Sequence, residues 1–239
     1  MLRAEAPAAS TVLHRESQAS ASTGGRNKHA SADGQPFIVT LQLDKHSHEK
    51  LTHLRSRHFP KHRNYLEAHI TLFHALPARN KADYPPLLKT VAAGKNSFRV
   101  KIGSPFSLGG KGVGVPVTSP ASSSARHDTP QPPHHKTKPH PHSDRITHVR
   151  SDLARALKSA NIRLTPQDGR HMHAPHVTLQ NKVDEETAHR SLEEVKQTWH
   201  DWEAIAEGLE LYEYQPDGRW AFVDRFAFNP ASMKETATM

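Results

Sequence analysis

A four-residue pattern occurs twice in this chain of 239 residues and constrains its fold more than any other feature. The copies, His69-Ile70-Thr71-Leu72 and His176-Val177-Thr178-Leu179, start 107 positions apart, each inside a short apolar run typical of a strand. Side chains two apart in a strand share a face, so each histidine should lie beside its threonine. The apolar residues between them should point into a core: Ile70, Leu72, Val177 and Leu179.

Each predicted strand therefore offers one imidazole and one hydroxyl. Two imidazoles facing each other across a groove can act as general base and general acid, and two hydroxyls can hold the oxygens of a phosphate. We take His69 and His176 as candidate catalytic residues and Thr71 and Thr178 as candidate phosphate-binding residues. This is phosphoester chemistry that uses no metal, and we expect no cofactor.

Chance is the first alternative, because the chain holds 20 histidines. His29-Ala30-Ser31 lies in a polar stretch without a strand pattern, and His189-Arg190-Ser191 lies in a predicted helix. Only the two copies above combine a β-branched middle residue with a following leucine. The alternative interpretation, that both histidines are ordinary half-buried strand residues, is weakened by this shared context.

Composition divides the chain. Residues 1–35 and about 119–143 are poor in large apolar side chains and rich in Ser, Pro, His and Gly, which predicts a disordered tail and a low-complexity insert. We expect one domain over 36–229, interrupted by the insert, and a flexible C-terminus at 230–239.

Charge and cysteine content narrow the function. Of the net charge of +8, the tail carries +1 and the insert +2, so the remainder holds +5, which suits a polyanionic ligand such as an RNA end. With no cysteine, disulfides, thiolate zinc sites and cysteine nucleophiles are excluded. No apolar run approaches the roughly 20 residues that cross a bilayer. We expect a soluble, monomeric, cytoplasmic or nuclear protein; Glu5 and Glu16 argue against a mitochondrial presequence.

The two halves repeat one order of elements. In the first half we expect strands at 37–43, around His69, at 98–102 and at 112–117. We also expect one helix that is capped by Asp44 or Ser47 and carries Leu51 and Leu54, and a second, short helix through Leu87, Leu88 and Val91. In the second half we expect a helix that is capped by Ser143 and carries Ile146, Val149, Leu153 and Leu157, followed by the strand around His176. A further helix is expected to be capped by Asp184 and to carry Ala188, Leu192, Val195 and Trp199. Two final strands are expected at 209–214 and 220–228, on either side of a turn at 216–218.

This repetition predicts an α+β, bilobal fold with an approximate two-fold axis. Two antiparallel-rich sheets would flank a central cleft, with helices outside, and His69 would face His176 across the cleft.

Paired His-x-Thr strands, each preceded by a helix, resemble the 2H phosphoesterase superfamily, which includes 2′-5′ RNA ligase-like proteins and cyclic phosphodiesterases. The resemblance covers about Pro36 to Asn229 and is strongest over the two motifs. Thr165-Pro166-Gln167-Asp168 and the segment from Tyr212 to Trp220 also resemble the 2′-5′ RNA ligase-like branch.

The resemblance implies a bilobal fold and a site of His69, Thr71, His176 and Thr178. It implies substrates with a 2′,3′-cyclic phosphate, a 2′-5′ linkage or a related cyclic phosphodiester, at RNA ends or on nucleotides. The tail and the insert depart from the compact family pattern, whereas the catalytic positions are intact.

Other side chains carry weaker predictions. Phe73, Tyr214 and Trp220 are candidate base-stacking residues, with core packing as the alternative. The insert's His134, His135, His140 and His142, with His171 and His173, can bind metal only adventitiously, since no carboxylate or thiol accompanies them at regular spacing. The competing functions are an RNA-end binder without turnover, a ligase, and a scaffold that acts through its insert.

Overall fold

The computed structural model describes residues 34–119, 144–170 and 174–231. Its strands are β1 (Phe37–Leu43), β2 (Ile70–Leu76), β3 (Phe98–Ile102), β4 (Phe106–Ser107), β5 (Val113–Thr118), β6 (His176–Gln180), β7 (Trp202–Tyr214) and β8 (Trp220–Ala227). Its α-helices are α1 (Lys45–His58), α2 (Tyr84–Ala93), α3 (Arg145–Ser159) and α4 (Glu185–Gln197), with short 3-10 helices at Lys61–Arg63 and Ala78–Asp83.

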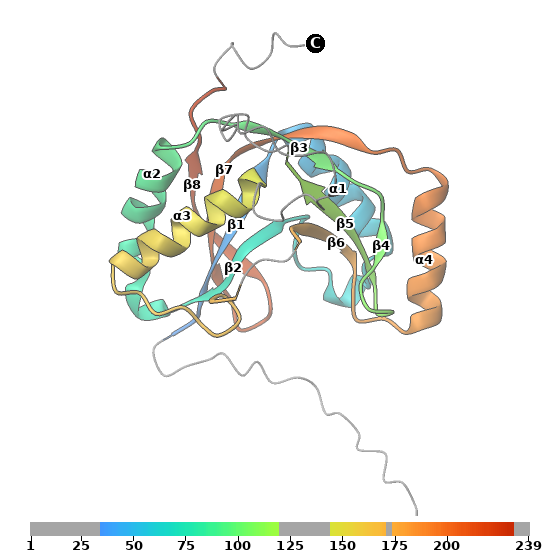
Figure 1. Ribbon diagram of the computed structural model, residues 1–239. Helices are drawn as coiled ribbons and strands as arrows, with labels where there is room; N and C mark the ends of the chain where they lie inside the picture. The colour runs from blue at the N-terminus through green and yellow to red at the C-terminus, as the bar shows by residue number, and fades with distance from the viewer. Residues whose placement is uncertain (1–33, 120–143, 171–173, 232–239) are drawn as a thin grey trace, which may run out of the picture.

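The strands form two antiparallel parts joined into one sheet. The order is β2-β1-β7-β3-β5-β4, with β8 paired to β7 and β6 paired to β5. The long strand β7 links the parts, because its first residues pair with β3 and its later ones with β1 and β8. Figure 1 shows two lobes, one carrying α2 and α3 and the other α1 and α4, which confirms the predicted bilobal α+β fold.

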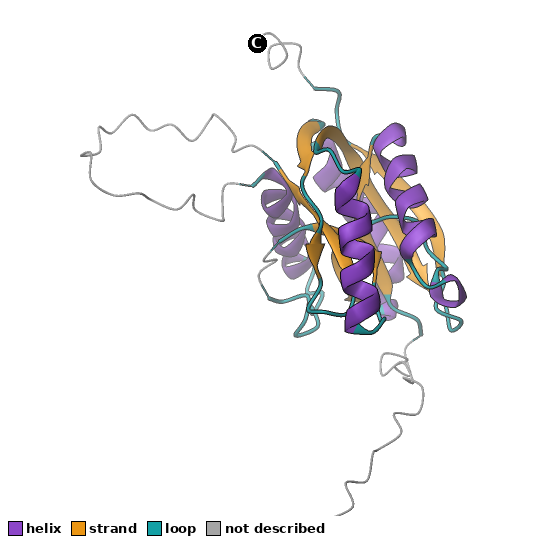
Figure 2. Ribbon diagram, turned by 90° about the vertical axis from the view of Figure 1, so that its right-hand side faces the viewer, coloured by secondary structure: helices purple, strands orange, loops and turns teal. Residues whose placement is uncertain are grey.

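The helices lie outside the strands (Figure 2), and two of them change lobes. Helix α1, from the first half of the chain, packs against β6, while α3, from the second half, packs against α2. Each motif strand is therefore contacted from the other half of the chain, β6 by the packing of α1 and β2 by a hydrogen bond from Arg150 of α3 to the Leu72 carbonyl. The strands β2 and β6, far apart in the order of the sheet, also contact each other.

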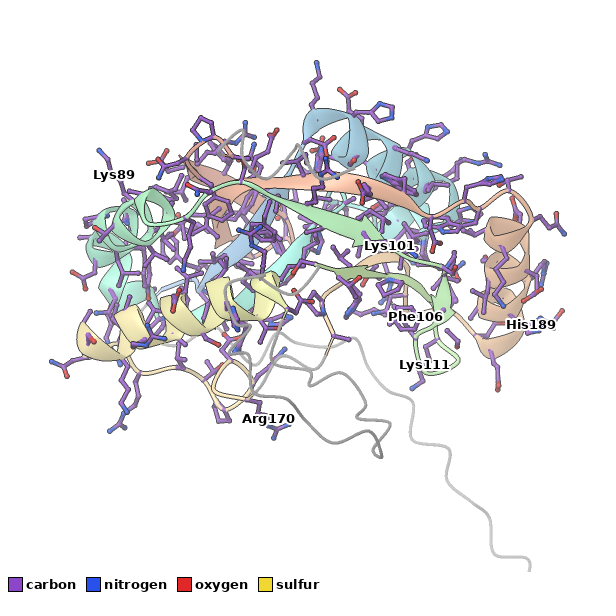
Figure 3. The ribbon with its side chains drawn as sticks, turned by 45° about the horizontal axis from the view of Figure 1, so that its top comes forward. Lys89, Lys101, Phe106, Lys111, Arg170 and His189 are labelled. Carbon is purple, nitrogen blue, oxygen red and sulfur yellow. The ribbon has the colours of Figure 1, made fainter. Side chains whose placement is uncertain are left out.

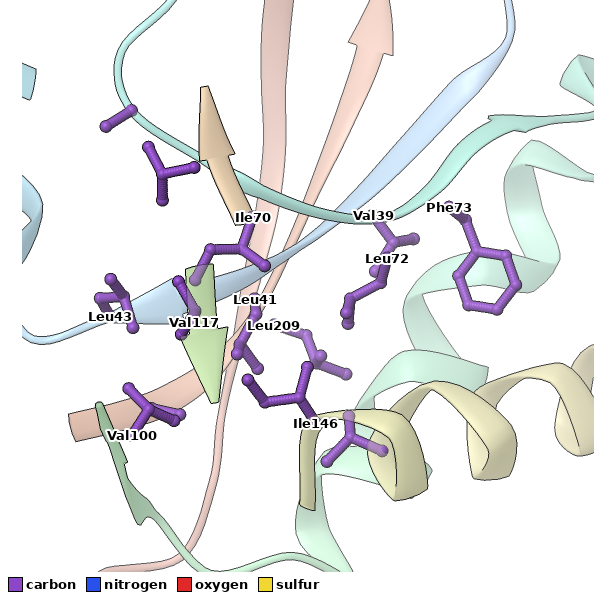
Figure 4. Close-up of a cluster of buried hydrophobic side chains, with 14 of the residues drawn as sticks. Val39, Leu41, Leu43, Ile70, Leu72, Phe73, Val100, Val117, Ile146 and Leu209 are labelled. Atoms are coloured by element: carbon purple, nitrogen blue, oxygen red, sulfur yellow. The ribbon is translucent and has the colours of Figure 1, made fainter. Parts of the chain in front are cut away.

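One hydrophobic core spans both lobes. The buried side chains of β1 and β2 join those of β3, β5 and α3 in a single cluster, part of which Figure 4 shows. The residues between the motif positions, Ile70, Leu72, Val177 and Leu179, are each at most 1% exposed, as predicted. This burial fixes the register of both strands, because a slip of one residue would turn each histidine into the core.

Local signals explain most element boundaries. The Asp44 carboxylate accepts from the Ser47 backbone N–H at 2.9 Å and caps α1, and Asp184 caps α4 in the same way through Thr187. Helix α1 ends before Pro60, with Phe59 extended as a residue preceding proline must be. The predicted turn at 216–218 joins β7 to β8, with Gly218 at a φ of +91°.

Four details differ from the sequence prediction. The cap of α3 is Asp144, which accepts from the Ile146 N–H at 2.8 Å; Ser143 lies outside the described residues. Trp199 follows the end of α4, and its ring packs at a tilt against the ring of Trp202, with 5.0 Å between the ring centroids. Strand β7 starts at Trp202 rather than at 209, because its early residues pair with β3, and the two-residue β4 has no sequence pattern of its own.

Candidate functional site

The structure brings the four predicted site residues together. His69, which immediately precedes β2, and His176, the first residue of β6, line one cavity of about 410 Å³. Thr71 and Thr178 line it as well, together with Arg150 and Trp220. The two motifs therefore contribute to a single cleft, although 107 positions separate them in the chain.

Both histidines are held in the same way. The Nδ1 atom of His69 lies 2.8 Å from the carbonyl oxygen of Glu67, and Nδ1 of His176 lies 3.0 Å from that of Ala174. Because a carbonyl only accepts, each Nδ1 must carry a hydrogen. This leaves Nε2 of each ring as the nitrogen that can accept or give a proton in the cavity.

Burial and neighbouring positive charge make His69 hard to protonate. Burial lowers the pKa of His69 to about 4, helped by the cation of Arg55 and by His74 and His176, while the Glu67 carbonyl opposes the shift. At neutral pH the ring of His69 is therefore an uncharged base.

The cavity wall carries hydroxyls and positive charge. Within the described part of the chain, the hydroxyls of Thr71 and Thr178 make no hydrogen bond, so both are available to a ligand. Arg150 adds a guanidinium at the cavity wall, and Arg170 adds another from the loop before β6, where Figure 3 shows it at the surface. Such donors suit the oxygens of a phosphate.

Arg150 reaches the site from α3 through its long side chain, which contacts β2. Its Nε donates to the Leu72 carbonyl at 3.0 Å and its Nη2 to the Asp168 carbonyl at 2.5 Å, and the guanidinium lies 4.9 Å above the Phe73 ring. Burial lowers its pKa and Asp168 opposes this, yet an arginine keeps its charge at neutral pH. Sequence reasoning missed Arg150, since it reads as an ordinary helical arginine.

Asp168 ties the loop before the second motif to the first motif strand. Its buried carboxylate accepts from the backbone N–H groups of His74 at 2.9 Å and Ala75 at 2.8 Å, and lies 3.2 Å from Nδ1 of His74. Burial alone would raise the pKa of Asp168, but these hydrogen bonds outweigh it and lower the pKa. Sequence reasoning noticed Asp168 only through the resemblance.

The three predicted stacking aromatics have different positions. The Trp220 ring lines the cavity, 4.6 Å from the His69 ring. Phe73 is fully buried in the core, because a register irregularity of β2 opposite Val39 turns its ring away from the face of Thr71. Tyr214 ends β7 outside the cavity wall, whereas Phe106, which no sequence pattern singled out, lies 6.1 Å from the His176 ring.

A second, larger cavity of about 560 Å³ shares His69 with the first. On its wall Arg225 donates to Glu210 at 2.7 Å, and Tyr212 donates to the same carboxylate at 2.8 Å. The side-chain oxygens of Thr40 and Gln42 are buried there with no partner among the described residues. Space and polar groups for a ligand therefore continue beyond the two motifs.

Several predictions fall outside the described residues: those on the tail, most of the insert, and the histidines His134, His135, His140, His142, His171 and His173. Where the chain is described, no three His, Cys, Asp or Glu side chains come together as metal ligands would. No described helix has the length and apolar character of a membrane span.

Known protein structures are similar to this chain at low sequence identity. The protein TT0787 of Thermus thermophilus is 13% identical with a TM-score of 0.50, over 82% of this chain and all of its own. E. coli LigT complexed with 3′-AMP is 16% identical with a TM-score of 0.48, over 81% of this chain and 98% of its own. A structure described as a phosphoesterase is 15% identical with a TM-score of 0.47, over 82% of this chain and 99% of its own. No curated protein matches the sequence.

A protein-family model matches most of this chain. The model of the 2′-5′ RNA ligase superfamily matches residues 43–218, which include both His-x-Thr motifs and most of the described elements. This chain belongs to the 2′-5′ RNA ligase superfamily, the 2H phosphoesterases.

Proposed function

We propose that this protein is a metal-independent phosphoesterase that acts on RNA ends or nucleotides carrying a 2′,3′-cyclic phosphate or a 2′-5′ linkage. The observation that carries the proposal is the single cavity lined by His69, Thr71, His176 and Thr178. Two imidazoles with free Nε2 atoms supply a base and an acid, and two hydroxyls supply donors for the non-bridging oxygens.

In the proposed reaction, one Nε2 removes a proton from water as the new O–P bond forms. The bond from phosphorus to a ribose oxygen breaks, and the other Nε2–H gives its proton to that oxygen. The products are a phosphomonoester and a free ribose hydroxyl. Thr71 and Thr178 hold the non-bridging oxygens, and Arg150 adds positive charge beside them.

A second candidate is the cleavage or formation of a 2′-5′ linkage. The 560 Å³ cavity that shares His69 favours it, because that volume exceeds the space a water nucleophile needs. A nucleoside on that side of the phosphorus would use the space, and a ribose hydroxyl would then replace water in the same chemistry.

The test is a substrate comparison with product analysis. Short RNAs ending in a 2′,3′-cyclic phosphate, and matched RNAs containing one 2′-5′ linkage, are incubated with the protein with and without EDTA. We expect turnover that EDTA does not reduce, with a product that keeps the phosphate on a defined ribose hydroxyl. Tight binding without turnover of either RNA would support an RNA-end binding module instead. Activity abolished by EDTA would contradict the metal-independent mechanism.

A further inference from the structure

A buried cation on α1 lies behind the site. Arg55 is 4% exposed, and its guanidinium rests 3.9 Å above the Phe59 ring. Burial lowers its pKa to about 10, so it remains charged at neutral pH. No carboxylate of the described chain lies within ion-pair distance of Arg55, which is unusual because buried charges are as a rule paired.

Arg55 connects the two histidine motifs through backbone atoms. Its Nη1 donates to the Thr178 carbonyl at 2.6 Å, inside the second motif. Its Nε donates to the Leu66 carbonyl at 3.0 Å, three residues before His69, and to Oδ1 of Asn64 at 3.0 Å. One rigid guanidinium thus fixes the segment leading to His69 relative to β6.

We propose that Arg55 is a positioning residue that keeps His69 as the neutral, proton-accepting imidazole of the pair and leaves His176 as the proton donor. This inference rests on the proposed function and assigns the roles that the sequence left open. Arg55 lines neither cavity, so it acts through His69 and the two motif segments and touches no substrate.

The groups around His69 favour this assignment. The Glu67 carbonyl, unlike a carboxylate, adds no full negative charge to stabilise an imidazolium. Burial is the largest cause of the lowered pKa of His69, and Arg55 on α1, His74 on β2 and His176 on β6 lower it further.

The remaining charged or titratable groups around the two cavities come from several elements. Most of their carboxylates are engaged elsewhere: Glu67 with His48, Glu210 with Arg225, and Asp168 with His74. Glu207 has no ion-pair partner among the described residues. The cations on the two walls are Lys45, Arg150, Arg170 and Arg225, and the Tyr212 hydroxyl on the wall of the larger cavity donates to Glu210.

Arg150 is the counterpart of Arg55 in the other half of the chain, but it has a different role. It lies on α3 and donates to the Leu72 carbonyl of the first motif, as Arg55 on α1 donates to the second. The guanidinium of Arg150, however, lines the cavity and can meet a phosphate directly. Each half of the chain therefore sends one arginine to the motif of the other half, and only Arg55 is hidden from a ligand.

The first test is an NMR titration of the His69 ring, assigned by comparison with His69→Gln, which requires no turnover. In the wild-type protein His69 should titrate well below its ordinary value of 6.5. Arg55→Met should raise the pKa of His69 by about 1, because a nearby like charge is removed. Arg55→Lys should keep the low pKa, since it keeps the charge. Arg57→Met, on the exposed side of the same helix, is the matched control.

The titration has clear contrary outcomes. A His69 ring that titrates near 6.5 in the wild-type protein would overturn the assignment, even if every Arg55 variant failed to fold. A folded Arg55→Met protein with an unchanged His69 pKa would show that Arg55 does not keep His69 neutral. Neither result depends on whether the proposed substrates are turned over.

The second test uses a phosphodiester with a p-nitrophenolate leaving group, which departs without help from an acid. The rate loss of His176→Ala should shrink to less than about tenfold with this substrate, whereas the loss of His69→Ala should persist. The acidic limb of the pH profile of kcat/KM should also shift to higher pH in Arg55→Met and not in Arg57→Met. The opposite rescue pattern would show that His176 is the base.

Discussion

At the scale of single residues, the hydroxyls of Thr71 and Thr178 are the groups that we expect to contact the phosphate of the substrate. Both line the shared cavity and make no hydrogen bond to the described protein. Replacing either by valine keeps the β-branched shape while removing the donor. We therefore expect each valine variant to lose about 10²-fold in kcat, as when one donor to a developing oxyanion is removed.

The measurement is steady-state kinetics on the RNA ending in a cyclic phosphate. Thr90→Val is the control, because the Thr90 hydroxyl donates to the Pro86 carbonyl on α2, away from the cleft. Wild-type kcat in both Thr71→Val and Thr178→Val would refute their role with the phosphate.

Asp168 carries a residue-scale prediction about stability and pH. Asp168→Asn removes the buried charge that accepts from His74 and Ala75, and we expect it to destabilise the protein by about 2 kcal/mol. Since the folded state lowers the pKa of Asp168 below its unfolded value of 3.8, its stabilising effect is complete above that pH. The effect is lost as the pH falls through the folded pKa.

Thermal melts of both proteins between about pH 7 and about pH 2 would measure this difference. The gap between wild type and Asp168→Asn should be constant near neutrality and should narrow below about pH 4. A gap that widens in acid would mean that Asp168 is protonated in the folded protein.

At the scale of elements, the approach of β5 to β6 holds the second motif in place. A Cβ atom on Gly112 would lie 2.0 Å from the Gln180 carbonyl oxygen and 2.7 Å from the Asn181 Cα, both backbone atoms that have little freedom to move. We expect Gly112→Ala to displace β6, lower stability by about 3 kcal/mol and reduce activity along with it.

Gly94→Ala is the matched control for that substitution. Its Cβ would meet only the carbonyls of Val91 and Thr90 at ordinary contact distances, so stability should change by less than about 1 kcal/mol. Chemical denaturation of both variants decides the point. A Gly112→Ala protein as stable as Gly94→Ala would show that β6 does not depend on this close approach.

The sequence predicted the elements whose signals are local. The strand at 37–43, the Asp44 and Asp184 caps and the turn at 216–218 all depend on neighbouring residues, and each is found where it was expected. The early part of β7 was missed because its pairing partner, β3, is far away in the chain. Phe73 was placed on the ligand face because strict alternation was assumed, and the irregular register opposite Val39 breaks it.

The candidate site was predictable only in part, for the same reason. His69, Thr71, His176 and Thr178 repeat a pattern, and repetition is visible in a sequence. Arg55 on α1 and Arg150 on α3 each donate to a backbone carbonyl of the motif in the other half of the chain, and no local pattern records that exchange. These contacts are visible only in the tertiary structure.

At the scale of the whole molecule, the residues on the two sides of the insert lie next to each other. The Ser119 hydroxyl donates to the Asp144 carboxylate at 2.5 Å and accepts from the Arg145 N–H at 2.6 Å, so the two ends of the described chain meet. Replacing residues 120–143 by about four Gly and Ser residues can therefore close the gap without strain.

We expect this deletion variant to fold and to keep kcat within about threefold of wild type, because His69, Thr71, His176 and Thr178 all lie in the described lobes. Melting curves and the RNA assay provide the measurement. An inactive but folded deletion variant would give the insert a direct part in substrate binding and would revive the scaffold interpretation.

The central claim is that two imidazoles, one from each half of the chain, act on one phosphorus atom. Single-turnover rates on RNA ending in a 2′,3′-cyclic phosphate test it most directly, in His69→Ala, His176→Ala and the exposed-histidine control His189→Ala (Figure 3). The account predicts losses on the order of 10²–10⁴ for each of the first two variants and a wild-type rate for the control. Rates within about threefold of wild type in both His69→Ala and His176→Ala would contradict it.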